Sequence, residues 1–145
     1  MKIYFAISGE PQGKARPRVV RTKNGSSHTY TPGKTVAYEK RVQMCYIEAT
    51  GGYTFPKGVE LSVAIEAFYS IPQSKSKKQR ALMSSGEIRP TKKPDWDNIG
   101  KIICDSLNGI AYSDDAQIVI ATVAKYYTAN SPYVTVTISE AAHDP

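Results

Sequence analysis

The amino-acid sequence predicts an α+β fold: a single compact domain over residues 1–145, in which helices pack on a mixed β-sheet. Two hydrophobic patterns are interspersed along the chain, one with apolar residues at every second position and one with apolar residues three or four positions apart. The first pattern is typical of strands and the second of helices, and their expected order is β, α, β, α, α, β, β. A length of 145 residues suits one domain with its own hydrophobic core.

The first half of the chain is expected to contain two strands and one helix. Residues 2–8 alternate between apolar and polar side chains, as a strand does, and residues 59–69 alternate most regularly of all. Residues 21–33 are polar and rich in Gly and Ser, which is typical of a loop or loose hairpin. Residues 34–49 have the spacing of a helix.

The second half is expected to contain two helices followed by two strands. A short basic helix is predicted over 74–84, with Ser74 or Ser76 as its cap. The next predicted helix covers 98–108, where apolar residues recur at helical spacing and Asp97 has the right position for an N-cap. The two final strands are predicted at 117–127 and 132–138.

The charges are distributed unevenly along a chain whose formal net charge is +6. Residues 1–51 contain nine Lys or Arg and three Glu, and residues 71–93 contain seven Lys or Arg and one Glu. Residues 94–145 reverse the sign, with six Asp and one Glu against two Lys. Two basic segments and one acidic segment indicate a polyanion held near a carboxylate site, a combination that a nuclease requires.

Other functional classes are disfavoured by the same sequence. No stretch approaches the roughly 20 apolar residues that span a bilayer, and the N-terminal apolar run lacks a cleavage site, so we expect a cytoplasmic protein without a membrane partner. Cys45 and Cys104 are expected to be reduced thiols. Together with His28 and His143 they lack the spacing of a zinc site, so no zinc is expected.

Two acidic pairs flank the helix predicted over 98–108. Asp95 and Asp97 precede it and would point the same way if that segment is extended, whereas Asp114 and Asp115 follow it. A helix of about 11 residues spans roughly 16 Å, so the pairs meet only if the intervening loop folds back along the helix. Carboxylates about 5 Å apart repel by roughly 3 kcal/mol at an effective dielectric near 20, which either a shared proton or a divalent cation would offset. Oxygen-only ligands favour Mg²⁺, with Mn²⁺ as a possible substitute.

Each of these features also has a purely structural interpretation. Lys101 can form a salt bridge with Asp97 or Asp105, four residues away on either side, or it can stabilise the transition state of phosphodiester hydrolysis. Two aspartates separated by one residue are common in solvated turns, as are adjacent aspartates. Trp96, between the first two acids, can pack against the protein or contact a base or sugar.

The combination of these residues resembles the signature of the RusA family of Holliday junction resolvases. The resemblance is carried by the segment from Lys93 to Ile118, which includes Pro-Asp-Trp-Asp-Asn at 94–98, Lys101, Asp105, Leu-Asn-Gly at 107–109 and Asp-Asp-Ala-Gln at 114–117. The segment Gly-Lys-Ala-Arg-Pro-Arg at 13–18 is also similar to the opening of phage and prophage members. The resemblance covers roughly 25 residues and this N-terminal motif.

The resemblance implies a homodimeric, Mg²⁺-dependent endonuclease with a compact α+β fold, which nicks a four-way DNA junction symmetrically during DNA recombination and repair. It assigns the required acids to Asp95, Asp97 and Asp115, and the required lysine to Lys101. Asp114 and Asn98 match positions that are expected to support the metal ligands. The sequence does not distinguish a bacterial from a phage host.

The basic segments are the predicted DNA contacts, with an ordinary solvated surface as the alternative. The residues expected to contact phosphates are Lys14, Arg16, Arg18, Lys75, Lys77, Lys78, Arg80, Lys92 and Lys93. Two other functions stay open at this point: a nuclease that prefers other branched DNA such as flaps or forks, and a junction-binding protein that does not cleave.

Overall fold

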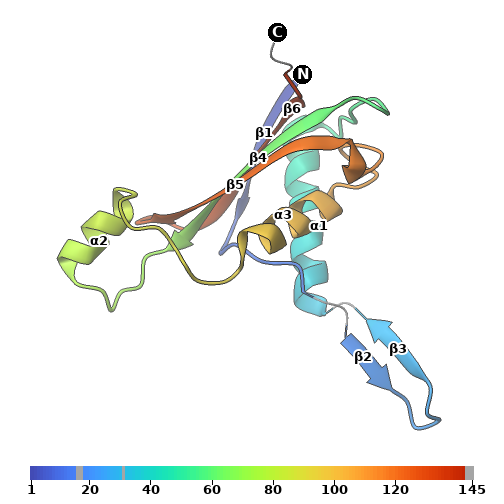
Figure 1. Ribbon diagram of the computed structural model, residues 1–145, viewed down its shortest axis with the longest axis horizontal. Helices are drawn as coiled ribbons and strands as arrows, with labels where there is room; N and C mark the ends of the chain where they lie inside the picture. Colours follow the sequence, from blue (N-terminus) through green and yellow to red (C-terminus); the bar gives the residue numbers. More distant parts are fainter. Residues whose placement is uncertain (16–17, 31, 143–145) are drawn as a thin grey trace.

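The computed structural model describes residues 1–15, 18–30 and 32–142; for residues 18, 28 and 30 only the backbone is considered. The described chain folds into a four-stranded sheet, a separate two-stranded hairpin and helices packed against the sheet (Figure 1). The elements are β1 (Lys2–Ser8), β2 (Arg18–Arg21), β3 (Ser27–Tyr30), α1 (Gly33–Thr50), β4 (Leu61–Ser70), α2 (Lys77–Ser84), α3 (Trp96–Ser106), the 3₁₀ turn η1 (Asp115–Gln117), β5 (Ile118–Thr128) and β6 (Tyr133–Glu140).

The main sheet is mixed, with the strand order β1-β6-β4-β5. Strand β6 pairs antiparallel with both β1 and β4, whereas β4 and β5 are parallel. Parallel neighbours need a crossover connection, and here the crossover contains α2 and α3. The predicted α+β domain with a mixed sheet and packed helices is therefore confirmed.

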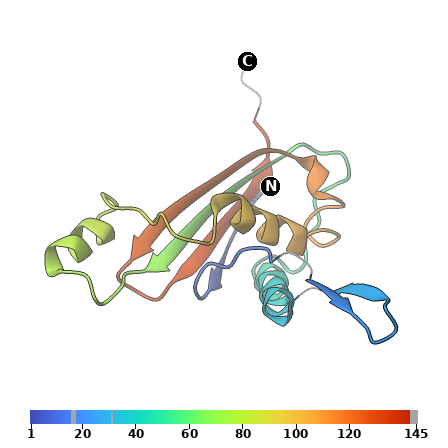
Figure 2. The ribbon, with the colours of Figure 1, turned by 60° about the horizontal axis from the view of Figure 1, so that its bottom comes forward.

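Helices α1 and α3 cover one face of the sheet, and the core lies between them and the strands (Figure 2). In β4 every second residue from Leu61 to Tyr69 is buried, which is the alternation that the sequence predicted. Gly100 of α3 faces β5, where a Cβ on it would lie 3.5 Å from Val123 Cγ2. Helix α3 is thus held on the sheet with its first turn directed toward the end of β5.

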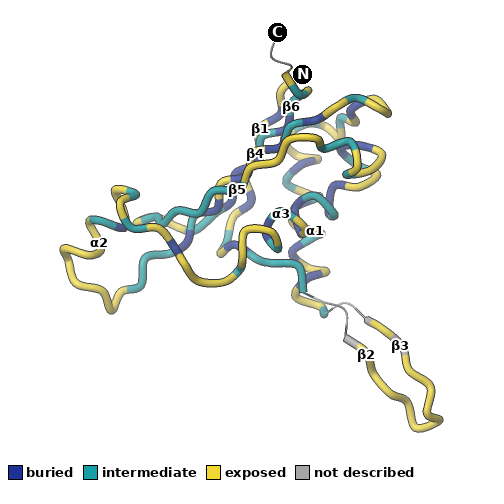
Figure 3. Tube along the Cα trace, in the orientation of Figure 1, coloured by how far each residue is buried: buried dark blue, intermediate teal, exposed yellow. Residues whose placement is uncertain are grey.

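The predicted strands and helices are found, with shifts of a few residues at their ends. The polar segment at 21–33 lies partly in the β2–β3 hairpin, whose described residues are largely exposed in Figure 3. The short basic helix begins at Lys77, and Ser76 is its cap, because the Ser76 hydroxyl accepts a hydrogen bond of 3.2 Å from the Gln79 amide. In the described residues no helix is both long and apolar enough to cross a membrane.

One predicted boundary is wrong in a way that affects the acidic residues. Asp97 was expected to be the N-cap of a helix that begins at residue 98, but α3 begins two residues earlier, at Trp96, and Asp95 is the N-cap. Asp95 retains extended backbone angles (φ −70°, ψ 154°), whereas Asp97 lies in the first helical turn. The two carboxylates are therefore not on one side of an extended segment, because side chains two residues apart on a helix point in different directions.

Candidate active site

The first predicted acid, Asp95, stands at the N-terminal end of α3. Its side chain caps no backbone N–H group, and the residue is exposed to solvent. The preceding residue is held by β4, because the Tyr69 hydroxyl donates a hydrogen bond of 2.8 Å to the Pro94 carbonyl oxygen. The carboxylate of Asp95 therefore lies where the dipole of α3 favours negative charge and where solutes can reach it.

Trp96 and Asp97 occupy the first turn of α3, and both are exposed. The Trp96 side chain is not part of the core, since the residue retains 66% of its accessible surface. No ion pair of Asp97 is found within the described parts of the chain. The first acidic pair thus presents two carboxylates and one indole ring to solvent.

The N-terminal glycine-containing segment packs against this end of α3. The Lys14 amide donates a hydrogen bond of 3.2 Å to the Asn98 carbonyl oxygen. A Cβ on Gly13 would lie 3.0 Å from Pro94 Cβ and 3.1 Å from Asn98 Cβ, a separation tighter than most real Cβ contacts. A glycine at position 13 is what permits this close approach. The two sequence motifs, 80 residues apart, are therefore neighbours in the fold.

A polar hollow of about 350 Å³ opens where these motifs meet. It lies beside the N-terminal end of α3 and includes several of the predicted site residues. Its lining residues are Pro11, Gln12, Gly13, Lys14, Lys34, Lys93, Pro94, Asp95 and Asn98.

The second acidic pair lies after α3, at the beginning of η1. Asp114 is the N-cap of this turn, and its Oδ1 accepts a hydrogen bond of 3.0 Å from the Ala116 amide. The amide of Asp115 donates a hydrogen bond of 2.8 Å to Asn108 Oδ1. These contacts fold the connection back onto the C-terminal end of α3, so that Asp115 is brought to Asp105 in the last turn of that helix.

The carboxyl groups at this end of α3 perturb one another. Burial raises the pKa of Asp115 above its ordinary value, and hydrogen bonds with Asp114 and Asp105 and their negative charges raise it further. The pKa of Asp114 is lowered, because the Ala116 amide and the Asp115 carboxyl both donate hydrogen bonds to it. Asp115 therefore loses its proton at a higher pH than Asp114 does.

Two lysines form ion pairs with Asp105 and so offset part of the negative charge of this acidic cluster. Lys101 Nζ lies 3.4 Å from Asp105 Oδ2, which is one of the two salt bridges that the sequence predicted for Lys101. No ion pair of Lys101 with Asp97 is found among the described residues. Lys14 Nζ lies 3.7 Å from the same oxygen and 3.0 Å from Glu39 Oε1. The Lys101 side chain is 61% exposed, so its ammonium group is accessible to a ligand. The Lys14 side chain is only 21% exposed.

The structure therefore divides the predicted acids into two groups at opposite ends of α3. Asp95 and Asp97 lie at its first turn, and Asp114 and Asp115 lie beside its last turn with Asp105. Within residues 1–15, 18–30 and 32–142, no three or more His, Cys, Asp or Glu side chains converge in a way that could hold a metal ion. The predicted meeting of Asp115 with Asp95 and Asp97 is not found within one chain.

The predicted DNA contacts are distributed over several surfaces. Lys75, Lys77, Lys78 and Arg80 are exposed on or just before α2, and Lys92 and Lys93 are exposed in the connector to α3. Arg16 lies outside the described residues, and of Arg18 only the backbone position in β2 is known. These basic residues thus border the N-terminal end of α3 and extend from it along the connector.

Two residues that the sequence did not predict as site residues belong to this region. Asp105 was quoted as part of the motif, but the structure makes it the link between Asp115 and both lysines. Lys125 was not selected, yet the charge of Asp95 acts on its pKa. The available signal was that Lys125 is the single charged residue in the strand predicted at 117–127.

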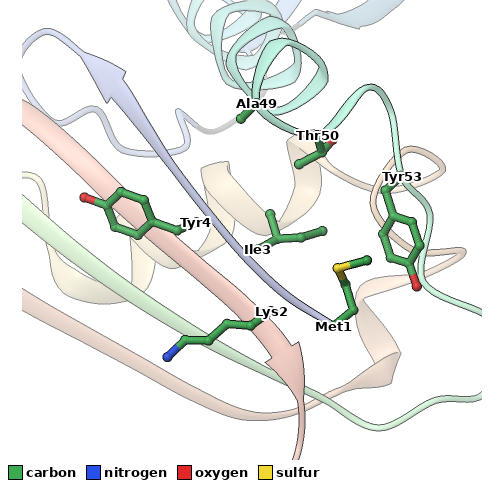
Figure 4. Close-up of a pocket in the computed structure, with 7 residues that line it drawn as sticks. All are labelled: Met1, Lys2, Ile3, Tyr4, Ala49, Thr50 and Tyr53. Carbon is green, nitrogen blue, oxygen red and sulfur yellow. The ribbon is translucent and has the colours of Figure 1, made fainter.

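Another hollow of about 350 Å³ lies away from the acids, beside β1 and the end of α1 (Figure 4). None of the predicted site residues lines it, and its polar groups provide no carboxylate. Its lining consists of Met1, Lys2, Ile3, Tyr4, Ala49, Thr50 and Tyr53.

Comparison with known proteins agrees with the arrangement of motifs around α3. The family model described as "Endodeoxyribonuclease RusA" matches residues 8–139, which include both acidic pairs and the segment around Gly13. The chain is also 34% identical over 143 residues to the "Uncharacterized protein YqaN" of Bacillus subtilis (strain 168), with 95% of this chain and 96% of that protein covered. A match that extends over nearly the whole described domain shows that the chain belongs to the endodeoxyribonuclease RusA family.

Proposed function

We propose that this protein is a Mg²⁺-dependent endodeoxyribonuclease that resolves Holliday junctions, and that it makes two symmetric nicks as a homodimer in the cytoplasm of a bacterium or phage-infected cell. Membership of a family of junction-resolving endonucleases is the observation that carries the proposal. The local chemistry supports it, because exposed carboxylates at the first turn of α3 adjoin a polar hollow that contains lysines. Such a surface can accept a phosphodiester next to acidic groups.

The chemistry of the carboxylates fits a divalent cation. Burial raises the pKa of Asp115, and the carboxyl groups of Asp114 and Asp105 raise it further; a bound cation would offset the repulsion between these groups. We assign Asp95, Asp97 and Asp115 as the ligands, with Asp114 and Asn98 in support, and an oxygen-only set favours Mg²⁺ or Mn²⁺. When bound, the ion would lower the pKa of a water molecule and neutralise charge on the phosphate.

Protein groups have separate tasks in this proposal. Asp105 holds Lys101 near the acidic cluster, while more than half of the lysine side chain stays exposed and can approach a phosphate oxygen as negative charge develops. The basic residues on α2 and in the connector contact the backbone of the DNA arms, which makes binding depend on salt concentration. Trp96, exposed between the two first acids, is free to stack on a base or sugar.

The separation of the acids within one chain favours a site completed by a second copy. A helix of 11 residues is about 16 Å long, so its two ends do not meet unless another element bridges them. Two copies related by a two-fold axis would place two identical sites on a symmetric junction. We therefore expect the active enzyme to be a dimer in which Asp115 of one copy approaches Asp95 and Asp97 of the other.

The experiment that tests the function is cleavage of a labelled four-way junction with and without Mg²⁺. Flap, fork and linear duplex substrates are the controls. We expect metal-dependent paired nicks in the junction and little cutting of the duplex. Cutting confined to flaps or forks would indicate the related nuclease function, and tight junction binding without any cutting would indicate a binding protein.

Mixing two inactive variants tests the dimeric site. If the acids are shared between copies, a heterodimer of Asp97→Asn and Asp115→Asn contains one site with both substitutions and one site with neither. The mixture is then expected to nick one strand, although each variant alone is inactive. If each site were built within one chain, both sites of the heterodimer would be damaged and the mixture would stay inactive.

A further inference from the structure

Lys125 is a charged residue on the helix-covered face of the sheet. It pairs in the β4–β5 register with Ala67, and its neighbours on that face pair with Ile65 and Tyr69, all of which are buried. Helix α3 lies over this part of β5, since Gly100 faces Val123 two residues before Lys125. A lysine that is only partly exposed here, on a face otherwise lined by apolar and aromatic groups, needs an explanation.

The surroundings of Lys125 are aromatic and cationic. Its ammonium group lies 5.2 Å from the centre of the Tyr69 ring, and it donates a hydrogen bond of 2.6 Å to the Lys92 carbonyl oxygen. The Lys92 ammonium group lies 5.9 Å from the Tyr69 ring centre and 5.8 Å from that of Tyr127. The Tyr69 ring thus lies near both ammonium groups, whereas the Tyr127 ring lies near that of Lys92.

These two cations lack a close anionic partner in the described residues. The three ion pairs found there involve Lys14 and Lys101 with Glu39 and Asp105, and neither Lys92 nor Lys125 takes part. Burial lowers the pKa of the Lys125 ammonium group, and the negative charge of Asp95 offsets part of this effect. Tyr69 also joins this group directly to the start of α3 through its hydrogen bond to the Pro94 carbonyl oxygen.

We propose that Lys125 and Lys92 form a phosphate-binding subsite of the DNA backbone beside Asp95, with the rings of Tyr69 and Tyr127 as its floor. The proposal rests on the proposed function, and it adds Lys125 and the paired geometry of the subsite to a set of expected phosphate contacts that already included Lys92. An anion bound by both ammonium groups would offset the repulsion between them and the partial loss of hydration at Lys125. A phosphate group of the backbone carries the required charge and lies beside the bond that the acids are proposed to cut.

The alternative to phosphate binding is a purely structural role for Lys125, and the experiment has to distinguish the two. Lys125 donates to the Lys92 carbonyl oxygen, and its own carbonyl oxygen accepts a hydrogen bond of 2.9 Å from Arg89 Nε. These contacts fasten the connector between α2 and α3 to β5, along which it runs in Figure 1. A residue with only this task would affect thermal stability and leave the number of phosphate contacts unchanged.

The experiment compares Lys125→Met, Lys125→Arg and Lys92→Met with the full-length wild type. Binding to a four-way junction and to a linear duplex is measured without metal at several salt concentrations, together with the melting temperature. Lys2→Met is the matched control, because Lys2 is an exposed lysine on β1, at the opposite edge of the sheet from β5. Lys92→Met removes an ammonium group but keeps the backbone carbonyl group that Lys125 contacts.

We expect Lys125→Met and Lys92→Met each to reduce the slope of log K against log salt by about 0.9 and to weaken binding roughly eightfold at 0.1 M salt. Lys125→Arg should retain the slope, and Lys2→Met should leave binding unchanged. Unchanged slopes in both methionine variants, with a lower melting temperature for Lys125→Met alone, would overturn the proposal in favour of the structural role.

The result also separates this inference from the proposed function. A wild type that binds DNA with these lysine-dependent slopes but does not cut the junction would contradict the function and retain the subsite. A wild type that cuts the junction with slopes that do not depend on Lys125 or Lys92 would contradict the subsite and retain the function. A wild type that binds no DNA would overturn both.

Discussion

The two ends of helix α3 carry the same kind of side chain in opposite situations. At the first turn, Asp95 and Asp97 are exposed and take part in none of the described ion pairs. At the last turn, Asp105 binds two lysines and Asp115 shares hydrogen bonds with two other carboxyl groups. The first pair is therefore available to solutes, whereas the carboxyl groups at the last turn already interact with lysines and with one another. Similar acidic motifs therefore differ in their chemistry because the residues that surround them in the fold differ.

The largest expected effect is the loss of cleavage when one acid at either end of α3 is substituted. Asp97→Asn and Asp115→Asn should each reduce Mg²⁺-dependent cleavage of a four-way junction by at least about a hundredfold, because each removes a proposed metal ligand. Single-turnover cleavage over a range of Mg²⁺ concentrations is the measurement. Asp97→Asn should bind the junction as well as or better than the wild type, since a negative charge beside the phosphates is lost. Glu140→Gln, an exposed acid at the end of β6, is the control and should be fully active. Normal cleavage by Asp97→Asn would show that the first turn of α3 is not part of the site.

A smaller loss of cleavage is expected from substitution of Lys101. This residue is either a purely structural partner of Asp105 or a group that stabilises the transition state. Its exposed ion pair with Asp105 is worth only about 0.3–0.5 kcal/mol, so Lys101→Ala should hardly change the melting temperature. If the lysine stabilises the transition state, cleavage should fall by roughly a hundredfold while junction binding stays within a few-fold of the wild type. Full activity combined with a slightly lower melting temperature would return Lys101 to a purely structural role.

The close packing at the first turn can be perturbed without changing any charge. Gly13→Ala places a Cβ against Pro94 and Asn98, at 3.0 and 3.1 Å from their Cβ atoms, so the N-terminal segment has to move. We expect a cost of about 1 kcal/mol, or a fall in melting temperature of roughly 4 °C, and a reduced cleavage rate. Gly33→Ala is the matched control, because nothing lies within 4 Å of its Cβ position. Equal melting temperatures for the two variants would contradict the observed approach of residue 13 to α3.

The smallest expected effect concerns the raised pKa of Asp115 beside the last turn of α3. The pKa of Asp115 is raised in the folded protein, so its ionisation opposes folding at pH values above that pKa, and the penalty disappears as the pH falls below the unfolded value. Without metal, Asp115→Asn should therefore raise the melting temperature at pH 7 by about 2 °C, the scale of a weak, solvent-screened repulsion in a domain of this size. The gain should vanish near pH 3. Thermal unfolding at both pH values tests this, and a lower melting temperature at pH 7 would contradict the crowding of these carboxyl groups.

Thermal unfolding in the presence of Mg²⁺ tests whether Asp115 is a metal ligand. A cation that binds the folded protein stabilises it by mass action, so the wild type should gain stability with Mg²⁺ while Asp115→Asn gains less. The difference between wild type and variant should then become smaller or reverse as the ion concentration rises. An identical response of both proteins would remove Asp115 from the set of proposed ligands.

Much of the fold followed from local patterns. Alternation in β1 and β4 and helical spacing in α1 and α3 predicted elements that the structure contains, because burial of one face imposes these periods on any stable strand or helix. The order of the elements also predicted a mixed sheet. The boundaries were less certain, and the assignment of Asp97 as N-cap failed since Asp95 and Asp97 are both suitable residue types and only the path of the chain after Pro94 separates them.

The candidate site was predictable as a set of residues but not as an arrangement. Asp95, Asp97, Lys101, Asp114 and Asp115 were selected from their types and from the family resemblance. The pair of Lys101 with Asp105 was one of the two alternatives that the sequence offered. Neither source reveals that Asp105 also contacts Lys14 and Asp115, because these contacts depend on where the N-terminal segment packs and on how the loop after α3 folds back. Lys125 was overlooked for a similar reason, since its meeting with Lys92 and Tyr69 requires the parallel pairing of β4 with β5.

By itself the sequence determined which segments become strands and helices, where charge of each sign accumulates, and which family the motifs resemble, because these properties depend on neighbours along the chain. Tertiary structure alone decided which acids stand together, which lysines are paired and which are left without a partner. Electrostatic interactions act over distances of a few ångströms in space, and residues as far apart as Gly13 and Asn98 become neighbours only when the chain has folded.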